Sequence, residues 1–161
     1  MSWQSRTTVK KGNLGEDLVA DYLESKGFIV YEPVTEGSHG FDKLAMKNKR
    51  ELVYAEVKAK ARRKYYPDTG INISHYEDYS YLYREYKMNI FIFFVDELLG
   101  EIYGGFLQEL RKPVEVNGQK YPLKHKGIIY FPLMNMRRNI AKLNAVDVKE
   151  LKKYNTRNYS Y

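Results

Sequence analysis

Residues 51–60 alternate between two kinds of side chain, and this alternation constrains the fold more than any other feature of the sequence. One side of the extended segment would carry Val53, Ala55, Val57 and Ala59, and the other side Tyr54, Glu56, Lys58 and Lys60. A period of two is typical of a strand with one face in the core. Glu56 and Lys58 should therefore project from the same, outer face, roughly 7 Å apart along the strand, while Val57 points into the core.

A predicted hairpin brings a second carboxylate near this strand. Residues 37–40 have the composition of a flexible turn, residues 41–46 that of a strand, and the polar residues 47–50 that of a tight turn. Antiparallel pairing across so short a turn would return Asp42 to the far end of the alternating strand, beside Glu56.

A third carboxylate lies on a helix predicted over residues 13–26. Apolar side chains recur there at helical spacing, and Gly27 is suited to end the helix. Glu16 falls about 20° from Leu23 on a helical wheel, at the edge of the apolar face. Because an unpaired charge in that position is costly, Glu16 needs a partner, which a metal site would supply.

These residues together resemble the PD-(D/E)xK nuclease superfamily, which includes many restriction enzymes and Holliday-junction resolvases. The matching pieces, within residues 12–60 and more loosely to about residue 95, are Gly15-Glu16, Gly40-Phe41-Asp42 and Glu56-Val57-Lys58. Phe41 stands where the family name has Pro, a position that varies. His75 and Tyr79 also resemble the Q-x-x-x-Y element of some relatives, with His in place of Gln.

The resemblance implies a role for each residue of the motif. Asp42 and Glu56 would ligate Mg²⁺ (or Mn²⁺), with the Val57 carbonyl completing the shell. Lys58 would orient or activate the attacking water, and Glu16 would assist. The residue types suit this chemistry, because Mg²⁺ prefers hard oxygen ligands and acidifies a bound water, and a nearby cation stabilises the developing anion.

The alternative is a solvated strand face without chemistry. Glu and Lys alternate on the exposed faces of many strands and pair across them, so an isolated E-x-K motif has little weight. The order of the elements favours a site, since a helix acid and a hairpin acid precede Glu56 and Lys58 on an alternating strand.

Basic residues are concentrated in two segments. The chain has 27 Lys and Arg against 20 Asp and Glu, a net charge of +7. One segment continues directly from the alternating strand, and its expected contacts to a nucleic-acid backbone are Lys60, Arg62, Arg63 and Lys64. The other segment is residues 137–161. A basic face that only maintains solubility is the alternative interpretation.

Composition favours a single cytoplasmic domain over residues 1–161, with residues 155–161 as a frayed tail. A chain of 161 residues can bury a substantial core. The absence of cysteine and of an apolar leader is typical of a reducing cytoplasm. No apolar run approaches membrane-spanning length, and three dispersed histidines do not predict a structural zinc site.

The rest of the sequence predicts a scaffold. Residues 65–70 are expected to form a loop, and Ser74 with Glu77 a capping box for a helix to about residue 87. The tyrosines of that helix are more typical of core packing than of base stacking. Further strands are expected at residues 89–95, 101–106 and 127–133, a hairpin at Asn117-Gly118, and short helices at residues 136–143 and 146–154.

The predicted fold class is α/β, a restriction-endonuclease-like mixed sheet between the first helix and the helix over residues 74–87. The predicted function is a Mg²⁺-dependent nuclease acting on DNA. A non-catalytic nucleic-acid-binding module, alone or in a larger complex, and an RNA-directed nuclease are the alternatives. The form of the substrate and the oligomeric state stay open, although cutting both strands with one site per chain favours a homodimer.

Overall fold

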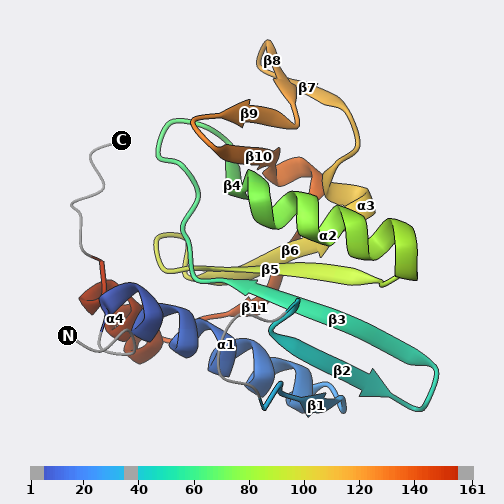
Figure 1. The fold of residues 1–161 in the computed structure, drawn as a ribbon. Coiled ribbons are helices and arrows are strands. Elements are labelled where there is room, and N and C mark those ends of the chain that lie inside the picture. Colours follow the sequence, from blue (N-terminus) through green and yellow to red (C-terminus); the bar gives the residue numbers. More distant parts are fainter. Residues whose placement is uncertain (1–5, 35–39, 156–161) are drawn as a thin grey trace.

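The structure is a computed structural model that describes residues 6–34 and 40–155 (Figure 1). The turn predicted at residues 37–40 therefore lies largely outside the described residues, and so does the predicted tail beyond Asn155. The helices are α1 (Thr7–Ser25), α2 (Ile73–Tyr86), α3 (Leu107–Leu110) and α4 (Ala145–Lys153), with a short 3₁₀ helix at Leu133–Asn135. No helix in the described ranges has the length and apolarity needed to cross a membrane.

A six-stranded mixed sheet forms the centre of the molecule. Its strands, in spatial order, are β1 (Ile29–Tyr31), β2 (Lys43–Lys47), β3 (Glu51–Lys58), β5 (Ile90–Asp96), β6 (Glu101–Phe106) and β11 (Arg137–Lys142). Strands β3 and β5 are parallel, and the other neighbouring pairs are antiparallel. The sheet therefore has the mixed character that the sequence predicts.

Two smaller sheets lie on the α2 side of the central sheet (Figure 1). One has the order β4 (Asp68–Asn72), β10 (Ile128–Pro132) and β9 (Leu123–His125). The other is the hairpin of β7 (Val114–Val116) and β8 (Gln119–Tyr121). Both turn residues of this hairpin have positive φ, 51° at Asn117 and 77° at Gly118, which confirms the predicted type I′ turn.

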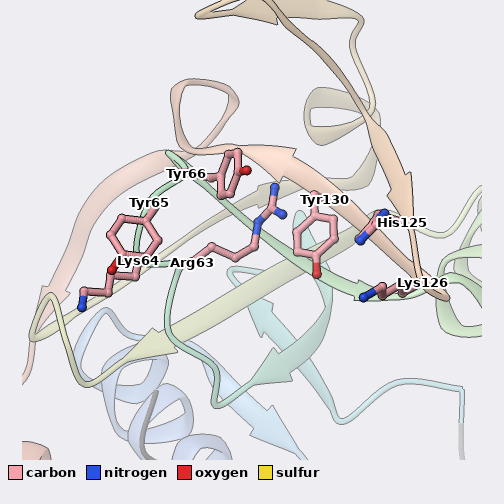
Figure 2. A pocket seen from close by; sticks show the side chains of 7 residues that line it. All are labelled: Arg63, Lys64, Tyr65, Tyr66, His125, Lys126 and Tyr130. Atoms are coloured by element: carbon pink, nitrogen blue, oxygen red, sulfur yellow. The ribbon is translucent and has the colours of Figure 1, made fainter. Parts of the chain in front are cut away.

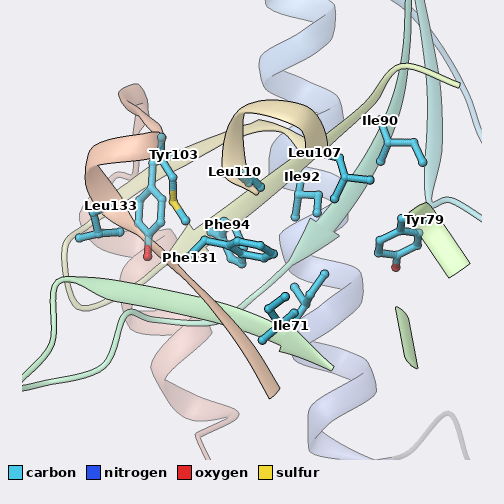
Figure 3. Packing of buried hydrophobic residues seen from close by; sticks show 12 residues of the cluster. Ile71, Tyr79, Ile90, Ile92, Phe94, Tyr103, Leu107, Leu110, Phe131 and Leu133 are labelled. Atoms are coloured by element: carbon cyan, nitrogen blue, oxygen red, sulfur yellow. The ribbon is translucent and has the colours of Figure 1, made fainter. Parts of the chain in front are cut away.

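Strand β5 is covered on both faces, as its apolar sequence predicts. Phe91, Phe93 and Val95 belong to a core with side chains of α1 and α4. The alternate residues Ile90, Ile92 and Phe94 belong to a second core with α2, α3, β4 and β10, shown in Figure 3. Helix α1 therefore packs on one face of the sheet and α2 on the other, as expected.

Helix α1 ends where the sequence predicts but begins six residues earlier. Its end is a Schellman motif, with Gly27 at φ 84° and the N–H of Phe28 donating to the Leu23 carbonyl at 3.1 Å. The early turns are held by a salt bridge, 2.7 Å from the Lys11 ammonium to the buried carboxylate of Glu97. Apolar periodicity cannot detect such an anchor, which is why the predicted start at residue 13 is wrong.

The helix predicted at residues 136–143 is wrong, because this segment forms strand β11. It pairs with β6, which would otherwise leave an open edge. The pairing shifts register between Arg137 and Ala141, and Asn139 has φ 53° within the shift. This irregularity removes the two-residue alternation by which a strand is recognised in a sequence.

Two smaller boundaries also differ from prediction around α2. The loop expected at residues 65–70 ends early, because Asp68 already begins β4. The N-cap of α2 is Asn72, so Ser74 lies inside the helix and the predicted capping box with Glu77 is wrong. The segment enters α2 directly from a paired strand, and the Ile73 N–H donates to the Gly127 carbonyl at 2.9 Å.

Candidate functional site

The β2–β3 hairpin places Asp42 directly opposite Glu56. Lys43 pairs with Ala55 in the antiparallel register, so Asp42 lies one residue beyond the end of β2. Its backbone N–H donates to the Ala55 carbonyl at 3.1 Å, and its Oδ2 accepts the Val57 N–H at 2.7 Å. The side chain of Asp42 therefore continues the hydrogen-bond ladder past the strand, and the predicted hairpin is confirmed.

Glu56 is buried, which corrects the prediction of an outer strand face. Its exposed fraction is 4%, and Ala55 and Val57 on either side are buried too. The alternation of β3 fails at this end because α2 covers the face that carries Glu56, and the hydroxyl of Tyr79 on α2 lies near its carboxylate. Burial raises the pKa of Glu56; the Lys58 charge opposes this rise, and the charge of Asp42 adds to it.

Lys58 lies between a carboxylate and an imidazole. Its Nζ donates to Glu56 Oε1 at 2.5 Å and lies 3.4 Å from Nδ1 of His75. Burial and then the Lys58 charge lower the pKa of His75, which favours the neutral ring at pH 7. The Nδ1 of a neutral ring can accept a hydrogen bond from the ammonium. His75 and Tyr79, one turn apart on α2, are thus both brought to the site.

Glu16 has a different partner from the one expected. Its Oε2 lies 3.4 Å from the ammonium of Lys43, which also donates to Glu32 at 2.7 Å. Lys43 is buried. Burial would lower the pKa of Lys43, but the carboxylates of Glu32 and Glu16 outweigh burial and raise it. The cation beside Glu16 is therefore a lysine of β2, which directs its side chain toward α1 while Glu56 faces α2.

Sequence reasoning missed the role of Lys43. The available signal was its place on the same face of β2 as Ala45, which belongs to the core packed against α1. A lone lysine on an apolar face needs a carboxylate partner, because burying an unpaired ammonium is costly. Glu16, at the edge of the apolar face of the neighbouring helix, was the carboxylate to pair with it.

The donor set of Asp42 and Glu56 fits a hard divalent cation. In residues 6–34 and 40–155, no group of three or more His, Cys, Asp or Glu side chains is gathered closely enough to hold a metal ion. Mg²⁺ does not require one, because it is commonly bound by one or two carboxylates together with water and substrate phosphate. The charge of Asp42 raises the pKa of Glu56, so two like charges lie close together where a cation would relieve their repulsion.

The basic segment that follows β3 divides into two pairs of residues. Lys60 and Arg63 are tied to β4. The Lys60 ammonium donates to the Gly70 carbonyl at 3.1 Å, and Arg63 makes a two-pronged contact with the buried Asp68, at 2.6 Å from Nε to Oδ1 and through Nη2 to Oδ2. Both therefore hold the segment in place.

The side chains of Arg62 and Lys64 make weaker contacts. The backbone N–H of Arg62 donates to Asp96 Oδ2 at 2.8 Å, whereas its guanidinium reaches only the Tyr66 carbonyl, at 3.4 Å. Lys64 is exposed, and its ammonium lies 5.1 Å from the centre of the Tyr65 ring. These two side chains are oriented by weak contacts and can reach an anionic partner.

Comparisons with known proteins support the fold. A comparison with protein-family models gives no match, and a comparison with curated protein sequences gives none either. Among solved structures, the chain is similar to Hjc from Archaeoglobus fulgidus, a Holliday junction resolvase from an archaeal hyperthermophile. The identity is 14% and the TM-score 0.53, over 77% of this chain and 90% of the resolvase. The predicted α/β fold with a restriction-endonuclease-like mixed sheet is confirmed, and the similarity to the resolvase is one of fold.

Proposed function

We propose that this protein is a divalent-metal-dependent nuclease that hydrolyses phosphodiester bonds of DNA. The observation that carries the proposal is the meeting of two carboxylates and an ammonium, those of Asp42, Glu56 and Lys58, at one end of the β2–β3 hairpin. The fold shared with a Holliday junction resolvase supports this class of chemistry.

Asp42 and Glu56 would hold Mg²⁺ (or Mn²⁺), with the Val57 carbonyl as a third oxygen ligand. When bound, the ion would supply an acidified water and neutralise charge on the phosphate. Neighbouring groups of the chain position these two carboxylates. The Val57 N–H fixes the carboxylate of Asp42 beside the strand, and the Tyr79 hydroxyl lies near that of Glu56.

Lys58 would stabilise the charge that develops on the phosphate. Its ammonium is held in place by Glu56 and by the neutral His75, so little reorganisation is needed when charge appears. Glu16 would assist indirectly, because it holds the buried Lys43, which follows Asp42 in the chain.

The basic segment would contact the nucleic-acid backbone next to this site. Arg62 and Lys64 would contact phosphates directly. Lys60 and Arg63, which are bonded to β4, would belong to the same basic surface. Such contacts carry no sequence information. A homodimer would supply the second site needed to cut two strands, and a chain without cysteine suits a reducing cytoplasm.

The test is cleavage of matched substrates with and without metal. Linear, circular and branched DNA and a single-stranded RNA would be incubated with the protein in Mg²⁺, in Mn²⁺ and in EDTA. We expect metal-dependent cleavage of DNA that Glu56→Gln abolishes, whereas Glu51→Gln, an exposed glutamate on the same strand, leaves it intact. Absence of cleavage in both metals, or full cleavage by Glu56→Gln, would refute the proposal.

One observation favours a non-catalytic nucleic-acid-binding module as the second candidate. The Lys58 ammonium already satisfies Glu56 Oε1 at 2.5 Å, so this carboxylate has a partner without a metal ion. Binding to DNA or RNA that is as tight in EDTA as in Mg²⁺, with intact substrate in both, would select this candidate. Cleavage of the RNA alone would select an RNA-directed nuclease.

A further inference from the structure

A pocket of about 280 Å³ lies beside the basic segment, between the loop that joins β3 to β4 and the three-stranded sheet (Figure 2). Its aromatic walls are Tyr65, Tyr66 and Tyr130, and its charged walls include Arg63, Lys64 and Lys126. A volume just below the roughly 300–1,000 Å³ range of small-molecule sites suits a single nucleotide unit.

The centre of this pocket is rigid. The Arg63 guanidinium lies 4.1 Å from the ring centre of Tyr66 and 3.9 Å from that of Tyr130, and Figure 2 shows its side chain passing between the two rings. Asp68, with an exposed fraction of 0%, forms an ion pair with Arg63 and accepts a hydrogen bond from the Tyr121 hydroxyl at 2.6 Å. A wall fixed in advance loses little conformational entropy when a ligand binds.

The rings of Tyr65 and Tyr66 are accessible from the solvent. Tyr65 is 70% exposed and Tyr66 46% exposed, and the two residues are adjacent in the chain. The last residue of β9, His125, and the first residue of the turn that follows, Lys126, line the other side of the pocket (Figure 2). Among the described residues that line the pocket, none is acidic. Aromatic faces next to the ammonium groups of Lys64 and Lys126 match a base joined to its phosphates.

Lys60 connects this pocket to the candidate metal site. Its ammonium lies 5.9 Å from the ring centre of Tyr130. Burial, the charge of Arg63 and the charge of Lys58 all lower the pKa of Lys60, so it lies within electrostatic reach of both the pocket and the site. A nucleic-acid strand bound along the segment that follows β3 would therefore pass from Lys58 to the pocket.

We propose that this pocket binds an unpaired nucleotide of the substrate strand, with its base stacked on Tyr65 or Tyr66 and its phosphates beside Lys64 and Lys126. The inference rests on the proposed nuclease function and names its substrate class, DNA with a single-stranded segment beside the scissile bond. A base inside a duplex has both faces covered by its neighbours, so only a frayed, displaced or single-stranded nucleotide can enter.

Fluorescence anisotropy in EDTA, where cleavage is suppressed, tests the pocket independently of catalysis. The probes are a labelled single strand, a blunt duplex of the same sequence and that duplex with a single-stranded tail. We expect the wild type to prefer the two probes with unpaired bases. Tyr65→Ala combined with Tyr66→Ala should weaken their binding about tenfold or more, the effect of losing a stacked base, and leave the blunt duplex unchanged.

Three further variants separate stacking from folding. The double variant Tyr65→Phe and Tyr66→Phe keeps both rings and should bind as the wild type does. Tyr65→Ala alone removes the more exposed of the two rings. It should lose part of the affinity for the probes with unpaired bases, with an unchanged melting temperature. Tyr86→Ala removes a tyrosine that is 66% exposed on α2, outside the pocket, and should have no effect.

The outcomes also separate this inference from the proposed function. If the tyrosine-to-alanine variants bind all probes as the wild type does, or lose affinity for all of them equally, the pocket does not take an unpaired nucleotide. Metal-dependent cleavage by those same variants would then leave the nuclease proposal standing. Selective loss of tailed-probe binding without cleavage by the wild type would support the pocket and refute the nuclease.

Discussion

The carboxylate of Asp42 accepts a hydrogen bond from the backbone N–H of Val57, with 2.7 Å between Oδ2 and the nitrogen. This contact joins the first candidate metal ligand to the strand that carries the second, Glu56. Asp42 therefore has one observed role, in the hydrogen bond, and one proposed role, in the metal site, and the two can be separated. The hydrogen bond needs an acceptor oxygen, whereas the proposed metal site needs a negative charge.

Replacing Asp42 in two ways separates these functions. Asp42→Asn keeps an acceptor for Val57 and removes the charge, so we expect nearly unchanged stability together with loss of Mn²⁺ binding. Asp42→Ala removes both and leaves the Val57 N–H without its partner, which should lower the free energy of unfolding by about 1–3 kcal/mol. Urea unfolding and calorimetric Mn²⁺ titration measure the two effects. Normal Mn²⁺ binding by Asp42→Asn would remove Asp42 from the metal site.

The burial of Glu56 makes its ion pair with Lys58 a stability element as well as a candidate catalytic pair. Lys58→Met removes the ammonium but keeps much of the side-chain volume, and it leaves a carboxylate with 4% exposure without its cation. We expect a loss of about 1–3 kcal/mol in the free energy of unfolding at pH 7. Adding Glu56→Gln should recover much of this loss, because the charge that needed a partner is gone.

Cleavage should behave differently from stability in this series. The single and the double variants should all be inactive, so recovered stability without recovered activity would show that the pair also serves chemistry. Lys142→Met, at an exposed position on β11, is the matched control and should change stability by less than about 0.5 kcal/mol. An active double variant would contradict the proposed role of Lys58.

Local patterns in the sequence predict the elements of this fold better than they predict what covers them. The apolar run of β5 and the Asn117-Gly118 turn are determined by nearby residues, and both are found as expected. The burial of Glu56 depends on Tyr79, 23 positions later, whose helix packs over the end of β3. No periodicity within β3 contains that information, so the outer face inferred for Glu56 was wrong.

For the candidate site too, local geometry could be predicted from the sequence, whereas contacts between distant elements could not. Hairpin geometry is local, so the meeting of Asp42 with Glu56 followed from the short turn between their strands. The pairing of Glu16 with Lys43 depends instead on how α1 lies across β2, which a sequence pattern does not specify. The division of the basic segment into anchored and weakly held residues likewise depends on β4, which begins at Asp68 within the predicted loop.

This division changes what substitutions in the basic segment should do. The double variant Arg62→Ala and Lys64→Ala should keep its stability within about 0.5 kcal/mol, because both side chains make weak contacts. Its plot of log affinity for duplex DNA against log salt should become shallower by about 1 to 2 units, roughly 0.9 per lost phosphate contact. Anisotropy titrations at several salt concentrations measure the slope.

Arg63→Ala should affect folding first. Asp68 would lose its cation at 0% exposure, which should lower the free energy of unfolding by about 3–5 kcal/mol. An unchanged slope and affinity for the Arg62 and Lys64 double variant would place the backbone-binding surface elsewhere on the molecule.

Two glycines of α1 provide a matched test of how closely this helix approaches the end of β3. A Cβ at Gly15 would lie 2.9 Å from the Cβ of Ala59, one residue beyond Lys58. Among the described residues, a Cβ at Gly12 would have no heavy atom within 4 Å apart from the neighbouring residues and backbone of its own helix. Gly12→Ala should therefore raise the free energy of unfolding by about 0.4–1 kcal/mol, through helix propensity and a less flexible unfolded chain. Gly15→Ala should lower it by about 1–3 kcal/mol, because the overpacked contact outweighs the same gain. Ala59→Gly in the Gly15→Ala background should restore part of the stability, measured by urea unfolding. Equal stabilisation by the two alanine substitutions would show that α1 is not in close contact with the end of β3 at Gly15.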